Sequence, residues 1–276
     1  MSFRKTLLAA TVLMAPAIAQ AQPVNGLYVA GGAGVNWHDN VSGQVTGFDG
    51  FEVQTATFGI RTDIGWVGVV SVGWGFGNGL RLELEGNYRS NEVDGFSSQG
   101  VSVTGARGTI STYGVMANAL YDIGATQGWP VHITLGGGIG YAWNRYSNVG
   151  VSNVINPSVA LDLRLNDTFG AFAYQGIAGI SVPIRSVPGL ALTAEYRYFA
   201  TLEGNVNGRL TQTGEVTRVT SLRMNADNAN QSVLVGVRYN FGRTPAAPPP
   251  AAAPAPARSF IVFFDFNRYD LTARAR

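Results

Sequence analysis

Residues 80–90, LRLELEGNYRS, alternate apolar and charged side chains, and no other feature constrains the fold as strongly. Successive side chains of a strand point to opposite sides, so Leu80, Leu82 and Leu84 would share one apolar face. The opposite face would carry charge, at Arg81, Glu83, Glu85 and Arg89. Such a strand turns its apolar face either into a protein core or out toward lipid, and the rest of the chain must decide between the two.

The alternation recurs along the chain. Eight segments carry it, at about 26–37, 64–76, 80–90, 111–122, 130–144, 169–182, 190–200 and 231–242. Each is close to the ~9–11 residues of a tilted membrane strand, and bacterial single-chain barrels have an even number of strands. Aromatic residues gather toward the ends of the apolar rows, where the two lipid–water boundaries of a barrel are expected.

The connections between these segments alternate between short and long. The short ones lie at about 77–79, 123–129 and 183–189, and the long ones at about 38–63, 90–110, 145–168 and 201–230. Four long unstructured loops are unusual in a compact soluble domain, but outer-membrane barrels carry long extracellular loops opposite short periplasmic turns. Backbone groups in hydrocarbon must all pair, so the sheet must close. The sequence therefore predicts an all-β fold, an eight-stranded antiparallel up-and-down transmembrane β-barrel over residues 22–243.

Composition agrees with export to a membrane. Charged residues make up 13% of the chain, about half of the roughly 25% usual in soluble domains. Residues 1–21 read as a signal peptide, with Arg4 and Lys5 before an apolar stretch and a cleavage site at Ala19 and Ala21. Without that leader, 19 − 2 = 17 basic residues balance 17 acidic ones, which argues against a nucleic-acid partner. The sequence shows no metal-ligand cluster, and we expect no cofactor.

An eight-stranded barrel is just wide enough inside to be filled by side chains, and buried charges there must pair. We expect a lumen charge network of Arg81, Glu83, Glu85, Arg89, Glu195, Arg197 and Arg238. Glu195 and Arg238 lie on neighbouring predicted strands and could pair directly, and Glu83 or Glu85 could reach Arg197 or Arg238 across the lumen. Asp122 and His132 could join nearer the turns. The network is either a closed structural element or a gate whose pairs exchange partners to admit ions.

A different composition follows the barrel. Residues 244–258, TPAAPPPAAAPAPAR, predict an extended Pro/Ala-rich linker. Residues 259–276, SFIVFFDFNRYDLTARAR, restart a strand pattern but are too few to bury a core of their own. We expect them to be the incomplete beginning of an α/β domain.

The order of leader, barrel, linker and final segment resembles the outer membrane protein A (OmpA) family. In particular, Phe260 to Ala275 is similar to the opening of that family's periplasmic peptidoglycan-binding domain. The resemblance implies a structural protein that anchors the bacterial outer membrane to peptidoglycan through a domain largely missing from this chain. The family's peptidoglycan-binding Asp and Arg have no matching positions here, and Asp265 and Asp270 do not correspond to them.

The resemblance also implies partners. These are outer-membrane lipid and lipopolysaccharide, peptidoglycan through the missing domain, and the barrel assembly machinery, which would recognise the last strand, LVGVRYNF, at Tyr239 and Phe241. Two alternatives stay open: a small gated ion pore, and a surface adhesin or receptor acting through the four long loops. Enzymatic activity is not expected, because the two histidines, His38 and His132, have no nucleophile and base arranged around them.

Overall fold

The computed structural model describes residues 23–39, 41–48, 56–98, 101–104, 106–156, 159–184, 186–213 and 217–242. All of them belong to one compact unit, Met1–Arg243. The predicted signal peptide with Ala19 and Ala21, the linker 244–258 and the segment 259–276 lie outside the described residues. No helix among the residues described is long and apolar enough to cross a membrane.

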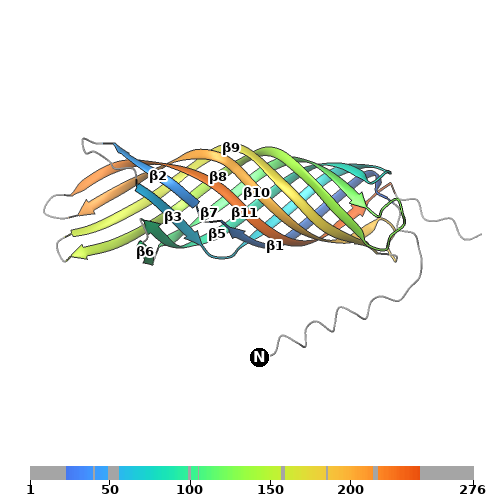
Figure 1. Ribbon diagram of the computed structural model, residues 1–276, viewed down its shortest axis with the longest axis horizontal. Helices are drawn as coiled ribbons and strands as arrows, with labels where there is room; N and C mark the ends of the chain where they lie inside the picture. The colour runs from blue at the N-terminus through green and yellow to red at the C-terminus, as the bar shows by residue number, and fades with distance from the viewer. Residues whose placement is uncertain are drawn as a thin grey trace, which may run out of the picture. The chain divides into compact units, whose positions relative to one another are not determined.

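Eleven antiparallel strands make up this unit (Figure 1). They are β1 (Asn25–His38), β2 (Val41–Phe48), β3 (Ala56–Thr62), β4 (Gly65–Phe76), β5 (Leu80–Ser98), β6 (Val101–Thr104), β7 (Arg107–Ile123), β8 (His132–Asn156), β9 (Val159–Pro183), β10 (Leu190–Thr213) and β11 (Arg218–Asn240). Eight of them pair in the order β1-β4-β5-β7-β8-β9-β10-β11, and β11 pairs back with β1. This closure confirms the predicted antiparallel up-and-down barrel.

The three short strands continue the wall of the same barrel. β1 pairs with β11 as far as His38 opposite Asn230, and β2 resumes along β11 from Val45 opposite Met224. In the same way, β4 and β3 pair with successive parts of one edge of β5. β7 and β6 pair with successive parts of the other edge of β5. The described wall is therefore closed by eight strands at the level of the membrane, and β2, β3 and β6 extend it beyond that level.

The long connections differ from the sequence-based expectation. They were expected to be loops, but much of their length is paired strand: β8 and β9 have 25 residues each, more than twice the ~10 needed to cross a membrane. The connection predicted at 145–168 is mostly the extended hairpin of β8 and β9. Pairing continues past the membrane because the inward face of this part buries an apolar core.

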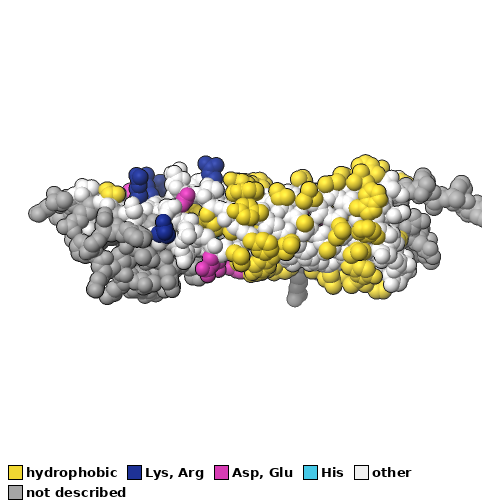
Figure 2. Space-filling model, turned by 90° about the horizontal axis from the view of Figure 1, so that it is seen from above, with side chains coloured by type: hydrophobic (Ala, Val, Ile, Leu, Met, Phe, Trp, Pro, Cys, Tyr) yellow, Lys and Arg dark blue, Asp and Glu magenta, His cyan; other side chains and the backbone are white. Residues whose placement is uncertain are grey.

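At the level of the membrane the barrel is apolar outside and polar inside. Leu80, Leu82 and Leu84 are 38%, 48% and 56% exposed, whereas Arg81 and Glu85 on the same strand are buried. Lipid takes the place of a protein core for the outward side chains, called the apolar belt below. Figure 2 shows hydrophobic side chains gathered over this part of the wall on the face in view, most densely in two bands. The alternation in residues 80–90 is thus that of a lipid-facing strand.

Beyond residue 90 the same strand reverses its pattern. Val93 is buried inside the barrel, while Glu92 and Asp94 are exposed outside, and Arg61 lies 3.7 Å from the Asp94 carboxylate. The inward residues here form an apolar cluster, called the outer core below: Ile60, Val93, Phe96, Ala106, Ile110, Tyr146, Val149, Leu165, Val206, Met224 and Ala226. Water surrounds this part instead of lipid, so the hydrophobic effect favours apolar side chains inside.

Glycines fix two features that position the lumen. Gly77 and Gly79 have φ of 75° and 94°, and they form the tight turn predicted between β4 and β5. Gly73 on β4 lies opposite Tyr28 on β1, and a Cβ at Gly73 would stand 2.3 Å from the Tyr28 ring. The missing side chain at Gly73 therefore makes room for the only large ring that β1 buries in the lumen within its described length.

Candidate functional site

The first charged layer of the lumen lies near the short turns and centres on Asp122 of β7. Arg81 of β5 donates two hydrogen bonds to its carboxylate, from Nε at 2.9 Å and from Nη2 at 3.0 Å. Thr134 Oγ1 donates a third at 2.7 Å, and Arg238 Nη1 lies 3.5 Å away. The carboxylate is thus shared between two guanidinium groups, which is the pairing that a buried charge requires.

Tyr28 connects this layer to the next. Its hydroxyl donates to Glu83 Oε2 at 2.9 Å and accepts from Arg81 Nη1 at 3.0 Å, while the Arg81 guanidinium lies 5.2 Å from the ring centre. Tyr28 was not among the residues predicted for the network. Its position in the alternation was the available signal, since it falls on the face opposite Leu27 and Val29.

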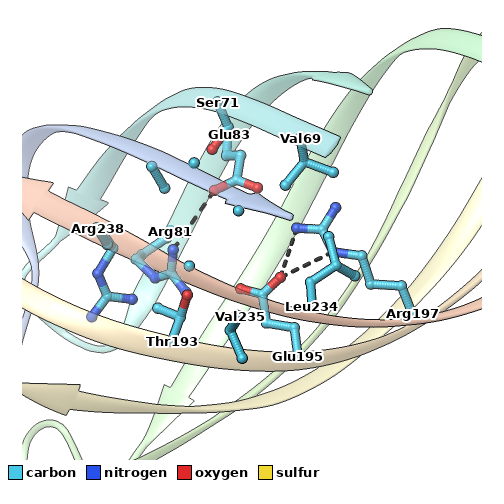
Figure 3. A pocket seen from close by; sticks show the side chains of 14 residues that line it. Val69, Ser71, Arg81, Glu83, Thr193, Glu195, Arg197, Leu234, Val235 and Arg238 are labelled. Atoms are coloured by element: carbon cyan, nitrogen blue, oxygen red, sulfur yellow. Dashed lines mark hydrogen bonds and ion pairs between the residues drawn. The ribbon is translucent and has the colours of Figure 1, made fainter. Parts of the chain in front are cut away.

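The second charged layer centres on Glu85 and Arg197, which meet across the lumen. Arg197 Nη1 of β10 lies 2.5 Å from Glu85 Oε2 of β5. Arg197 Nη2 lies 2.7 Å from Glu195 Oε2 (Figure 3). Asn118 and Gln175 donate to the remaining lone pairs of Glu85, at 2.9 and 3.3 Å. Glu85 therefore receives hydrogen bonds from three other strands of the barrel.

The anticipated direct pair of Glu195 with Arg238 is not among the salt bridges of the described residues. Glu195 instead binds Arg197 on its own strand, and Arg238 reaches Asp122 and Ser181, at 3.5 and 3.4 Å. The reason is geometric: Glu195 lies opposite Leu234, four residues along β11 from Arg238. Arg238 reaches down to the first layer, while Glu195 stays in the second.

Arg89 has a different environment from the other three lumen arginines. It is 1% exposed, donates from Nη1 to Asn87 Oδ1 at 2.7 Å, and stacks its guanidinium 3.9 Å from the centre of the Phe199 ring. No carboxylate among the described residues lies within salt-bridge distance of it. The lumen is nevertheless balanced, since four arginines (Arg81, Arg89, Arg197, Arg238) face four acids (Glu83, Glu85, Asp122, Glu195).

A layer of amides separates the charges from the outer core. Asn36 donates to Asn91 and Asn230, at 2.6 and 2.8 Å, and Asn228 donates to Thr112 and to Asn144. This layer was not predicted from the sequence. Asn228 and Asn230 were assigned to a long loop or its edge, so the alternation that places both inside the barrel was not followed that far.

Little open space remains between these side chains. A cavity of about 20 Å³ lies between Arg81, Glu83, Glu195, Arg197 and Arg238, with room for about one water molecule (Figure 3). Beyond the amide layer the outer core fills the barrel with apolar side chains. Side chains therefore fill the described lumen in the charged layers, in the amide layer and in the outer core.

The other residues singled out from the sequence lie outside these layers or at their edge. His132 is buried near the short turns, and His38 Nδ1 contacts the Asp39 carbonyl at the end of β1. Tyr239 and Phe241 point outward at the end of β11, with ring centres 5.0 Å apart. The described residues include no group of three or more His, Cys, Asp or Glu side chains that could hold a metal ion.

The chain is similar to several solved outer membrane proteins. OprG, an outer membrane protein from Pseudomonas aeruginosa, aligns with a TM-score of 0.48 and 11% identity, over 80% of this chain and 99% of that one. Neisserial surface protein A aligns with a TM-score of 0.39 and 18% identity, over 79% and 99% of the two chains.

Sequence comparison establishes the family. An outer membrane protein of Gluconacetobacter diazotrophicus is 40% identical over 298 residues, an alignment that covers all of this chain and 75% of that protein. The family profile for the outer membrane protein beta-barrel domain matches residues 6–241. The chain therefore belongs to the outer membrane protein β-barrel family and is a protein of the bacterial outer membrane.

Proposed function

We propose that the barrel is a closed membrane anchor, and that the protein ties the outer membrane to the cell wall through residues that follow the barrel. The packed lumen carries this proposal. Side chains of two charged layers, an amide layer and the outer core succeed one another along the axis, and the cavity between the charged layers has room for about one water molecule. A barrel without an open path serves to hold a protein in the membrane.

The cell-wall half of the proposal is supported by sequence alone. The Pro/Ala-rich residues 244–258 are suited to spanning a distance, because proline-rich segments are extended at about 3.1 Å per residue. Residues 259–276 resemble the opening of the OmpA family's peptidoglycan-binding domain. We propose that peptidoglycan is the partner of this part of the protein.

Co-sedimentation with purified peptidoglycan sacculi tests the anchoring role. The natural full-length protein should remain with sacculi after detergent extraction of the outer membrane. A variant that ends at Gly242 should be released, while still showing the heat-dependent gel mobility of a folded barrel. Equal sedimentation of both proteins, or release of both, would contradict the anchoring role.

A small gated pore is the second candidate, and Arg89 is the observation in its favour. Glu85 binds Arg197, whereas Arg89, four residues along β5, has no carboxylate partner among the described residues. Glu85 could therefore exchange one arginine for the other. Discrete conductance in planar bilayers, altered by Glu83→Ala or Arg197→Ala, would support the pore, and its absence in the unaltered protein would support the closed anchor.

We further propose that the protein is not an enzyme. His38, the histidine at the outer end of β1, has the Asp39 backbone carbonyl as its closest polar contact. Incubation with labelled lipid A provides the test. Turnover that is lost in His38→Ala would show that the barrel is a catalyst.

A further inference from the structure

On the outside of the barrel, two rows of side chains run side by side across β5, β7 and β8. The first, called the aromatic row, is Tyr88, Tyr113 and Trp143, which lie directly opposite one another in register. The second, called the polar row, lies two residues further along each strand: Ser90 is opposite Ser111, Ser111 opposite Arg145, and Arg145 opposite Thr168 of β9. The sheet register therefore places an arginine and three hydroxyls beside a continuous aromatic surface.

The aromatic row is a connected surface. The rings of Tyr113 and Trp143 stack with centres 5.6 Å apart, and Tyr141 meets Trp143 edge-on at 5.1 Å. At the other end Trp66 of β4, which lies opposite Ser90, approaches Tyr88 to 5.1 Å. All five rings are more than a third exposed. They mark the boundary of the lipid on the side of the long hairpins, which is the extracellular side in barrels of this class.

The polar row is partly fixed by its own hydrogen bonds. The Tyr88 hydroxyl donates to Ser111 Oγ at 3.2 Å, and the Ser90 and Ser111 hydroxyls are 3.4 Å apart. Arg145 is exposed, and no carboxylate of the described residues lies within salt-bridge distance of it. It stands two residues beyond Trp143, about 5 Å further from the lipid at the usual rise and tilt of barrel strands. A cation without a carboxylate partner among the described residues thus lies just outside the belt.

We propose that the aromatic and polar rows together bind the phosphorylated disaccharide headgroup of the lipid A that surrounds the barrel in the outer leaflet. Arginine matches phosphate with charge-assisted hydrogen bonds, and it does so better than a point charge. The serine and threonine hydroxyls supply partners for sugar hydroxyls. The exposed tyrosine and tryptophan rings offer flat surfaces to the C–H faces of the sugar rings, and the acyl chains continue along the apolar belt below.

Among the described residues, the wall formed by β1, β10 and β11 lacks this combination. At the outer end of β1 and β11, Gln231 lies opposite Trp37 and donates to the Asp39 carboxylate at 3.1 Å, while Tyr196 donates to Gln231 at 2.9 Å. An acid stands there where Arg145 stands on β8, and it would repel a phosphate. The structure thus assigns the headgroup to the face formed by β5, β7 and β8. This assignment depends on the barrel lying in the outer membrane and is independent of the cell-wall role.

Native mass spectrometry of the full chain, purified in mild detergent and titrated with lipid A, tests the site. We expect bisphosphorylated lipid A to bind at least tenfold more tightly than the same lipid after dephosphorylation, since a lost charge-assisted hydrogen bond is worth about that factor. Arg145→Gln should bind bisphosphorylated lipid A at least tenfold more weakly than the unaltered protein does. It should therefore bind the phosphorylated and the dephosphorylated lipid with equal affinity. Trp143→Leu should weaken both lipids several-fold and keep the preference for phosphate.

Arg164→Gln is the matched control, because Arg164 is also an exposed arginine of the outer face but is bonded to Asp162 at 3.1 Å. It should bind lipid A within twofold of the unaltered protein. Three results would overturn the proposal: equal binding by Arg145→Gln and the unaltered protein, an equal loss in Arg164→Gln, or equal competition by phosphatidylglycerol. The comparison of phosphorylated with dephosphorylated lipid uses the unaltered protein, so phosphate recognition is tested even if a variant fails to fold, and equal binding of the two lipids would also overturn the proposal.

Discussion

Replacing Glu85 with glutamine should destabilise the barrel strongly, because Glu85 is the carboxylate that Arg197 meets across the lumen. Glu85 is 1% exposed and accepts hydrogen bonds from Arg197, Asn118 and Gln175. In Glu85→Gln, Arg197 keeps only Glu195 as an acidic partner, and four lumen arginines face three acids. Removing one member of a buried ion pair costs about 3–5 kcal/mol, and we expect about 3 kcal/mol because Glu195 remains.

A double-mutant cycle separates the pair from its surroundings. Arg197→Met alone leaves Glu85 and Glu195 without their arginine, and we expect a cost of about 3–4 kcal/mol. The double variant restores the balance, with three arginines facing three acids. Its loss in free energy of unfolding should be about 3 kcal/mol smaller than the sum of the losses in the two single variants. This is at the upper end of the coupling energies between contacting residues.

Urea unfolding of barrels folded into lipid vesicles provides the free energies, with tryptophan fluorescence and heat-dependent gel mobility as the two signals. Glu92→Gln is the matched control, since it makes the same chemical change on the same strand at an exposed position. Its effect should lie within about 0.5 kcal/mol. If Glu85→Gln costs no more than this control, or if the two lumen changes add without coupling, the reasoning about the charged layers is wrong.

Three further variants address other parts of the barrel. Tyr146→Phe should stabilise the protein by about 1 kcal/mol in urea unfolding, because the hydroxyl is buried in the outer core without a hydrogen-bond partner among the described residues. Gly73→Ala should lower the yield of refolded barrel on gels, because its Cβ would stand 2.3 Å from the Tyr28 ring; an unchanged yield would show that Tyr28 can move aside. Phe241→Ala should reduce the amount of barrel in outer membranes but not refolding of the purified protein; equal loss in both assays would indicate a folding defect instead of failed recognition by the assembly machinery.

The sequence by itself determined the eight strands that cross the membrane and the sidedness of the membrane part. Side chains of a strand alternate strictly between its two faces. In a closed membrane sheet, the leucines between Leu80 and Leu84 therefore face lipid, and the charged residues between Arg81 and Glu85 face the lumen. The Gly77–Gly79 turn could also be predicted from the sequence, because glycine accepts the positive φ that a tight turn needs.

The sequence did not determine how far the barrel extends beyond the membrane. Residues 91–93 continue the alternation of β5, with Val93 on the same side as Arg89. A register shift against β3 follows at Asp94, so that Phe96 also lies in the outer core. Only the closed wall shows that this side is still the inside, where water outside the barrel now makes an apolar interior favourable. The polar character of the long connections indicated loops, because their outward residues do face water.

Only the tertiary structure decided which charges meet. Composition supplies acids and arginines of equal number, but partners are chosen by the register of non-neighbouring strands around a closed barrel. That register brings Glu85 of β5 to Arg197 of β10, 112 residues away, and leaves Glu195 two residues from its partner on its own strand. It also aligns Ser90, Ser111 and Arg145 into a single outer row. A strand's own sequence fixes which face a side chain takes, whereas its neighbours across the sheet and the lumen depend on closure and stagger, which belong to the barrel as a whole.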